Sequence, residues 1–274
     1  MTHKNYLEDL NNSKKTFIIY KSNKGFDLYT DFSKRIILTN NNVKRFINES
    51  TKLKSKRKET DLFIGFFGYE ILNNLIGVKV KKQKGLKFPK GIFYKPETKL
   101  KLPIKLNYRN LGIVKPNTLF KININKTSYK IIFNKFKKKI KSGETYQIKI
   151  CTKYRNKTQI DALDFFCRLV KSNMAPEAFM IKDKDYSIIS CSPENLINKK
   201  NDFITTKPIA GTLKKTKKLN KIKALAFFKK NIKETKEHNM IVDMERSDLS
   251  RICKAGSVKI LKKKIVEEYK DLYH

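Results

Sequence analysis

Residues 233–249 read KETKEHNMIVDMERSDL and hold the densest group of chemically active side chains in the sequence. They lie in a long helix that the sequence predicts over about 219–244. On such a helix Glu234, Glu237 and His238 occupy positions i, i+3 and i+4, and they therefore share one face of adjacent turns. Two carboxylates and an imidazole on one face can hold a hard cation or serve acid–base chemistry. A solvated helix face with ordinary surface ion pairs gives the same pattern.

Two shorter segments upstream of this helix place polar residues at turns. In CSPENLI, residues 191–197, a proline fixes the backbone before Glu194, which lies between short apolar strands. A carboxyl group held there could have a raised pKa and act as a general acid. In TTKPIAGT, residues 205–212, the predicted strand breaks at Pro208, and Gly211 permits close backbone approach to a ligand. Taken alone, either pattern is also that of an ordinary turn.

The residues before these segments predict a mixture of helices and strands. A helix is expected between a cap at Thr127 or Ser128 and Gly143, because apolar residues recur there at helical spacing. Alternation over 146–154 predicts a strand with one polar face, and a further helix is expected over 161–172. Short strands are expected around 178–181, 187–190 and 203–206. Because these elements follow no regular βαβ order, the sequence favours an α+β fold over a doubly wound sheet.

The first 110 or so residues differ from the remainder in pattern. Short apolar runs alternate with turns there, as in GFFGYE at 65–70 and FPKGIFYKP at 88–96, and this spacing is typical of strands and hairpins. Residues 97–126 are rich in lysine and asparagine with little periodicity. A boundary is therefore expected near residue 120, between an amino-terminal region over 1–120 and a second region over 121–274.

The net charge of +38 raises the question of nucleic-acid binding. Only eight of the 63 basic residues are arginine, although phosphate and base recognition favour the arginine fork. The lysines are spread along the whole chain together with many asparagine and isoleucine residues, as AT-rich codons would supply. We therefore expect no nucleic-acid partner, and we expect the charge to attract small anions.

The apolar runs and the cysteines bear on where the protein resides. The longest apolar runs are far too short to span a bilayer, and the first residues show no signal-peptide pattern. The four cysteines are far apart and include no CxxC pair, so we expect them to be reduced. These features predict a cytoplasmic protein without a membrane segment.

Five segments occur in a fixed order: GETYQIKI at 143–150, SCSPENL at 190–196, TTKPIAGT, KETKEHNMIVDMERSDL, and GSV at 256–258. This series resembles the chorismate-binding enzyme family, which includes anthranilate synthase component I, aminodeoxychorismate synthase component I, and the isochorismate and salicylate synthases. The resemblance covers roughly 127–274, and GFFGYE also looks like part of the family's amino-terminal region. It implies an anthranilate synthase component I-like α+β fold of mixed and antiparallel sheets flanked by helices, with 121–274 as the first part of the catalytic domain.

The resemblance also implies a chemistry and a set of site residues. Members of the family bind chorismate with one Mg²⁺ held by glutamates. In the amino-using members ammonia adds at ring C2 as the C4 hydroxyl departs, which calls for an acid near that hydroxyl and a cation at the ring carboxylate. The resemblance places Glu194 as the acid, Glu237 with Glu234 at Mg²⁺, His274 near the leaving hydroxyl, and Ala210, Gly211 and Thr212 against the substrate.

Two positions favour one reaction within the family. Water-using members tend to carry a lysine base where this chain has Gln147, which cannot activate water as a base. Aminodeoxychorismate synthases often read PIKGT, with a lysine that can attack the ring, where this chain has Ala210. The resemblance therefore favours anthranilate and pyruvate formation, in tryptophan biosynthesis, over aminodeoxychorismate formation. It also implies a glutamine amidotransferase subunit that supplies the ammonia.

The sequence also departs from the family pattern. Ser247 stands where asparagine is common, and lysines follow the GT of TTKPIAGT where an arginine-rich run is usual. The family continues beyond the position of His274 into segments that supply further Mg²⁺ glutamates and carboxylate-binding residues. We therefore expect a fold and a site that are incomplete at the carboxyl terminus, and negligible activity of this chain alone. A fragment, one chain of a split enzyme, and a non-catalytic relic all fit this pattern.

Overall fold

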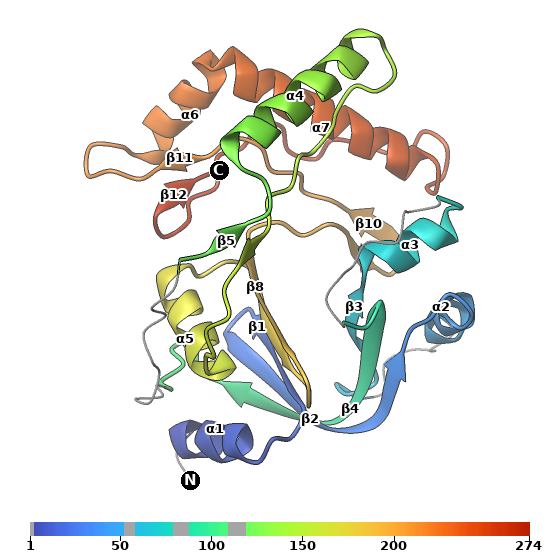
Figure 1. Ribbon diagram of the computed structural model, residues 1–274, viewed down its shortest axis with the longest axis vertical. Helices are drawn as coiled ribbons and strands as arrows, with labels where there is room; N and C mark the ends of the chain where they lie inside the picture. The colour runs from blue at the N-terminus through green and yellow to red at the C-terminus, as the bar shows by residue number, and fades with distance from the viewer. Residues whose placement is uncertain (1–2, 52–57, 79–87, 109–118) are drawn as a thin grey trace. The chain divides into compact units, whose positions relative to one another are not determined.

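The computed structural model describes residues 3–51, 58–78, 88–108 and 119–274 (Figure 1). The chain forms two compact units, one from Met1–Arg109 with Ala162–His274 and the other from Asn110–Asp161. The larger unit contains a six-stranded sheet together with four of the five ordered segments, and GETYQIKI with Gln147 lies in the smaller unit.

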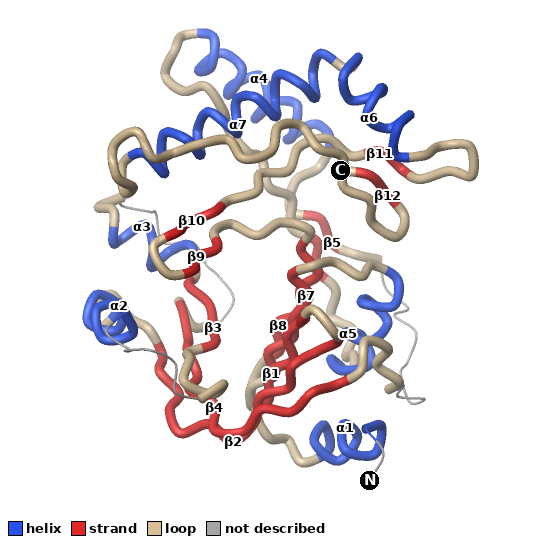
Figure 2. Tube along the Cα trace, turned by 180° about the vertical axis from the view of Figure 1, so that it is seen from behind, coloured by secondary structure: helices blue, strands red, loops and turns tan. Residues whose placement is uncertain are grey.

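The sheet has the strand order β3-β4-β2-β1-β7-β8, and all of its pairs are antiparallel. Its strands curl strongly, as the tube in Figure 2 shows, and β2 carries a bulge between Phe32 and Lys34. The last strand, β8, runs directly into the segment that contains Glu194. The strand bounds are β1 Phe17–Ser22, β2 Gly25–Ile37, β3 Ile64–Phe67, β4 Gly91–Leu102, β7 Glu177–Lys182 and β8 Ser187–Ser192.

Helices α1 (His3–Asn12) and α5 (Ala162–Ser172) pack on one face of this sheet. Helix α5 buries Leu163, Phe166, Cys167 and Val170, a spacing of three and four residues that gives one continuous apolar stripe. The Phe166 ring meets the ring of Phe26 on β2 edge to face, with centroids 5.8 Å apart. This layer forms the largest apolar core of the described residues.

A buried ionic group lies beyond the end of β7. The Asp183 carboxylate accepts hydrogen bonds from Arg35 Nη2 at 2.7 Å, from Thr16 Oγ1 at 3.1 Å and from the hydroxyl of Tyr94. Burial raises the pKa of Asp183, but these donors outweigh burial and lower the pKa to about 2.

Helices α2 (Val43–Thr51) and α3 (Tyr69–Leu75) contribute to a separate, smaller apolar core near β3 and β4.

The segment after β8 forms short strands and two helices. Strands β9 (Asn198–Lys200) and β10 (Phe203–Thr205) form a hairpin, and β11 (Leu213–Lys214) pairs with β12 (Leu272–Tyr273). The prediction of one helix over about 219–244 is wrong, because α6 (Lys221–Lys230) and α7 (Ile232–Ser250) are separate. Asn231 breaks the helix: its backbone is extended at φ −82° and ψ 98°, and its side chain caps α7 by accepting from Glu234 N.

The smaller unit contains β5 (Lys121–Ile122), α4 (Lys126–Lys141) and β6 (Tyr154–Arg155). Helix α4 is the predicted one, but Asn125 caps it in place of Thr127 or Ser128, by accepting from Ser128 N at 2.8 Å. The predicted strand over 146–154 is mostly loop. Apolar alternation alone does not make a strand, and only 154–155 find a hydrogen-bonded partner, in β5.

The mixed α+β architecture and its antiparallel sheet confirm the predicted fold class. Within the described residues, no helix has both the length and the apolar character needed to cross a membrane.

Candidate functional site

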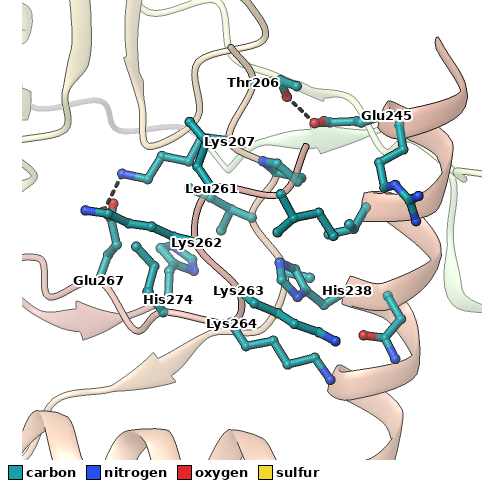
Figure 3. A pocket seen from close by; sticks show the side chains of 18 of the residues that line it. Thr206, Lys207, His238, Glu245, Leu261, Lys262, Lys263, Lys264, Glu267 and His274 are labelled. Atoms are coloured by element: carbon teal, nitrogen blue, oxygen red, sulfur yellow. Dashed lines mark hydrogen bonds and ion pairs between the residues drawn. The ribbon is translucent and has the colours of Figure 1, made fainter. Parts of the chain in front are cut away.

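A cavity of about 550 Å³ lies beside α7 in the larger unit (Figure 3). The residues from Ile204 to Ala210 form one wall, α7 forms the second, and the segment from Val258 to Glu267 forms the third. His274 lies at one end of the cavity. Three of the five ordered segments thus line one cavity: TTKPIAGT, KETKEHNMIVDMERSDL, and GSV with the residues that follow it.

The cavity lining carries more positive than negative charge. Among the described residues that line it, seven are lysine or arginine and three are glutamate: Lys207, Lys229, Arg246, Lys259, Lys262, Lys263, Lys264, Glu234, Glu245 and Glu267. Figure 3 shows the side-chain hydrogen bonds from Lys207 to Glu267 and from Thr206 to Glu245. The remaining basic excess makes the cavity suited to a small anion with more than one negative charge.

His274 is fixed by both its backbone and its ring. Its backbone N–H and C=O pair with Glu267 O and Glu267 N, each at 2.8–2.9 Å. Its ring Nδ1 lies 2.8 Å from Gly211 O and 3.2 Å from Thr212 Oγ1. The structure therefore brings three residues singled out from sequence, His274, Gly211 and Thr212, into direct contact.

Gly211 has a φ of +81°, a conformation that favours glycine. A Cβ atom at this position would lie 2.8 Å from the Phe228 ring and 3.2 Å from Glu234 Oε2. The position thus needs glycine for two separate reasons, its backbone angle and the close approach of α6 and α7. Ala210, immediately before it, lines the cavity.

Helix α7 divides the three residues predicted to share a face. Glu234 and His238 line the cavity, whereas Glu237 is half-buried and is not part of the described lining. No group of three His, Cys, Asp or Glu side chains able to hold a metal ion occurs in the part of the chain that the structure describes. Mg²⁺ commonly takes one or two protein carboxylates and completes its shell with water and substrate oxygens. Of the two glutamates predicted as its ligands, the structure places only Glu234 at the cavity.

Glu194 lies outside the cavity lining but contacts the wall that contains Ala210. Its Oε1 accepts a hydrogen bond from Ile209 N at 3.2 Å, and its side chain is exposed. The turn before it is closed by Ser192 Oγ, which accepts from Glu194 N at 3.2 Å and donates to Glu194 O at 3.0 Å. The turn SPEN, residues 192–195, therefore holds the Glu194 carboxyl group against the segment PIAGT, residues 208–212.

Gln147 belongs to the smaller unit, in the loop that follows α4. Its side chain is exposed, and its backbone carbonyl accepts a hydrogen bond from Thr145 Oγ1 at 3.2 Å. Its predicted role stays a prediction.

Three polar residues at the site were not identified from sequence. Lys207 pairs with Glu267, and Tyr269 lies close to both Glu267 and Glu194. Burial raises the pKa of Tyr269, the two carboxylates raise it further, and it reaches about 12. Burial also raises the pKa of Glu267, but Lys207 outweighs burial and leaves that pKa lowered. The sequence signals were the place of Lys207 within TTKPIAGT and the position of Glu267 and Tyr269 just before His274.

Comparison with known proteins identifies the family to which these segments belong. Residues 3–274 match the family model described as chorismate binding enzyme. Anthranilate synthase component 1 from Buchnera aphidicola subsp. Pemphigus spyrothecae is 27% identical over 273 residues, covering 84% of this chain and 52% of that protein. Aminodeoxychorismate synthase component 1 from Bacillus subtilis (strain 168) is 33% identical over 141 residues, covering 51% of this chain and 30% of that protein.

A solved structure shows the same fold. The crystal structure of anthranilate synthase component I from Streptococcus pneumoniae TIGR4 matches with a TM-score of 0.66 at 22% identity, covering 94% of this chain and 65% of that chain. The present chain spans about half or less of the length of the two curated relatives. Its fold, its ordered segments and the family match over nearly its whole length agree: the chain belongs to the family of chorismate-binding enzymes.

Proposed function

We propose that this chain binds chorismate in the cavity beside α7 and forms part of an anthranilate synthase component I. The reaction would convert chorismate and ammonia, or glutamine, into anthranilate and pyruvate. Chorismate is a dicarboxylate, and the basic excess of the cavity lining suits it. The single observation that favours anthranilate over the aminodeoxy product is Ala210, which lines the cavity and offers no nucleophile.

The proposed roles of the site residues follow the resemblance to the chorismate-binding family. Glu194 would protonate the departing hydroxyl, with His274 near it, and the 210–212 backbone would contact the substrate. Glu237 and Glu234 would hold Mg²⁺, which supplies a Lewis acid at the ring carboxylate. With two protein carboxylates, the cation would depend on the substrate and water for the rest of its shell. Binding of chorismate and Mg²⁺ should therefore be mutually dependent.

A titration tests this coupling in the full 274-residue chain. Calorimetry with chorismate should show saturable binding in the presence of Mg²⁺ and much weaker binding in its absence. Glu237→Gln should remove the Mg²⁺ dependence, because an amide lacks the charge that a hard cation needs. Lys236→Gln, on the neighbouring exposed position, serves as the matched control and should keep it. Binding that ignores Mg²⁺ in the unaltered chain would contradict the proposed cation site.

Turnover tests the product and the completeness of the site. We expect negligible anthranilate fluorescence from this chain with chorismate, Mg²⁺ and ammonium, because the chain spans only about half the length of its anthranilate synthase relative. A polypeptide that supplies the remaining part of the family fold should restore it, and a glutamine amidotransferase should then allow glutamine to replace ammonium. Anthranilate produced by the 274-residue chain alone would refute the expected incompleteness. A restored complex that gives no turnover would support a non-catalytic relic.

The second candidate is aminodeoxychorismate formation, which the 33% identity to the Bacillus subtilis relative favours. Chromatography of the products of the restored complex separates the two, because only anthranilate formation releases pyruvate. Ala210→Lys should shift the product towards aminodeoxychorismate. If the unaltered complex already gives that product, the anthranilate proposal is wrong.

A further inference from the structure

The hydroxyl of Tyr269 lies between two separate parts of the larger unit. It is 3.3 Å from Pro193 O, in the turn that holds Glu194, and 3.2 Å from Glu267 Oε2. A tyrosine hydroxyl has one proton and can donate to either acceptor. Its raised pKa keeps this proton in place at neutral pH. The side chain therefore links the SPEN turn to the segment that ends at His274.

Each end of this link reaches a residue of the proposed reaction. On one side, Pro193 directly precedes Glu194, whose Oε1 also accepts from Ile209 N. On the other side, the Tyr269 ring meets the His274 ring edge to face, with centroids 5.4 Å apart. Glu267 pairs with the backbone of His274 and receives Lys207 on its other carboxylate oxygen. Glu194 and His274 are thus both supported by one aromatic side chain.

The remaining support of the SPEN turn is thin. Glu194 is exposed, and its turn is held by Ser192, by Ile209 N and by Asn195, which donates to Glu177 Oε1 at 3.1 Å. Because the bonds of Ser192 and of Ile209 N are exposed and that of Asn195 is only part-buried, the loss of the Tyr269 hydroxyl should change how the Glu194 carboxyl group is held.

We propose that Tyr269 is a positioning residue, which fixes the Glu194 turn and the His274 ring relative to each other for the bound ligand. In this role Tyr269 touches no reacting atom and acts through Glu194 and His274. The inference rests on the function proposed above, in which Glu194 and His274 act on the same chorismate molecule.

The test compares two tyrosine substitutions in the full chain. Tyr269→Phe keeps the ring against His274 and removes only the hydroxyl. Tyr273→Phe is the matched control, because the Tyr273 hydroxyl also donates to a backbone carbonyl, Leu219 O, at 3.3 Å. NMR of chain labelled with ¹³C in glutamate and histidine side chains reports on both ends of the link. Glu194→Gln and His274→Gln assign the two signals.

We expect Tyr269→Phe to shift the Glu194 carboxyl signal and the His274 ring signals, and Tyr273→Phe to leave the Glu194 signal in place. In the presence of Mg²⁺, Tyr269→Phe should weaken chorismate binding about tenfold, the size expected when a hydrogen bond to a charged site is lost. Unchanged Glu194 and His274 signals in Tyr269→Phe, or equal shifts in both variants, would overturn the proposal. If the unaltered chain binds no chorismate, the proposed function fails, and the NMR comparison still decides whether Tyr269 positions the two groups.

Discussion

Strand β1 buries Phe17, Ile18 and Ile19 completely, whereas the nineteen described residues of α7 include no buried side chain. The contrast extends to the cores around them. The core beside β1 contains fourteen buried residues, and the core beside α6 contains three, Ala224, Val266 and Tyr273. Apolar burial therefore holds the sheet, while hydrogen bonds and ion pairs hold much of the segment from Pro193 to His274.

This difference indicates where stability and chemistry lie in the molecule. A side chain that must bind a ligand or a cation cannot be packed away in an apolar core. The segment with the cavity leaves apolar side chains exposed, including Phe203 at 78% and Leu261 at 81%. Substitutions in the sheet should therefore change the free energy of unfolding, and substitutions beside α7 should change ligand binding more than stability.

The largest effect on stability is expected for Phe166→Ala. This ring is fully buried against Phe26, and its loss leaves a cavity, so the free energy of unfolding should fall by about 3–5 kcal/mol. Phe228→Ala is the matched change beside the ligand cavity, where the ring is half-buried. It should cost about 1–2 kcal/mol. Urea unfolding of both variants measures the difference, and equal losses would show that the two regions do not differ as described.

A smaller effect is expected from pH. Because the folded pKa of Asp183 is lowered to about 2 from 3.8, its contribution to stability is complete above pH 3.8 and is lost as the pH falls towards 2. Its partner Arg35 is partly exposed, so this contribution should be about 1–2 kcal/mol. Unfolding curves between pH 5 and pH 2, compared for the unaltered chain and Asp183→Asn, measure it. A slope that survives in Asp183→Asn must come from other carboxylates.

The smallest effect is expected at the surface pair of α2. Arg45 Nε lies 2.7 Å from Glu49 Oε1, but both side chains are largely exposed. Water and salt screen such a pair, so Arg45→Ala should leave the melting temperature unchanged within error. A clear drop would mean that α2 depends on this pair more than its exposure suggests.

The sequence predicted the fold class and the presence of helices better than it predicted where individual helices and strands begin and end. The helix that ends before Gly143 and the α+β class follow from local patterns that a single sequence contains, whereas the cap expected at Thr127 or Ser128 lies at Asn125. The break at Asn231 was missed because asparagine is also tolerated inside helices, and only its cap geometry separates α6 from α7. The strand expected over 146–154 needed a partner that local alternation cannot specify.

At the site, likewise, the sequence did not predict which side chains meet. Lys207 and Glu267 are sixty residues apart in the sequence, and they meet where Glu267 pairs with the backbone of His274 beside Gly211. No pattern within either segment predicts that pairing. The family resemblance supplied roles for individual positions, and the structure supplied the neighbours, such as Tyr269, through which those positions can be held.

The proposed chorismate site is tested by comparing the chorismate affinities of Gly211→Ala and Gly256→Ala in the presence of Mg²⁺. Both glycines have positive φ, at +81° and +73°, so both variants carry the same backbone strain. Only at Gly211 would the added Cβ also meet Phe228 and Glu234, and nothing lies within 4 Å at Gly256. We expect Gly256→Ala to bind chorismate like the unaltered chain and Gly211→Ala to lose binding. Equal binding by the two variants, or no binding by the unaltered chain, would contradict it.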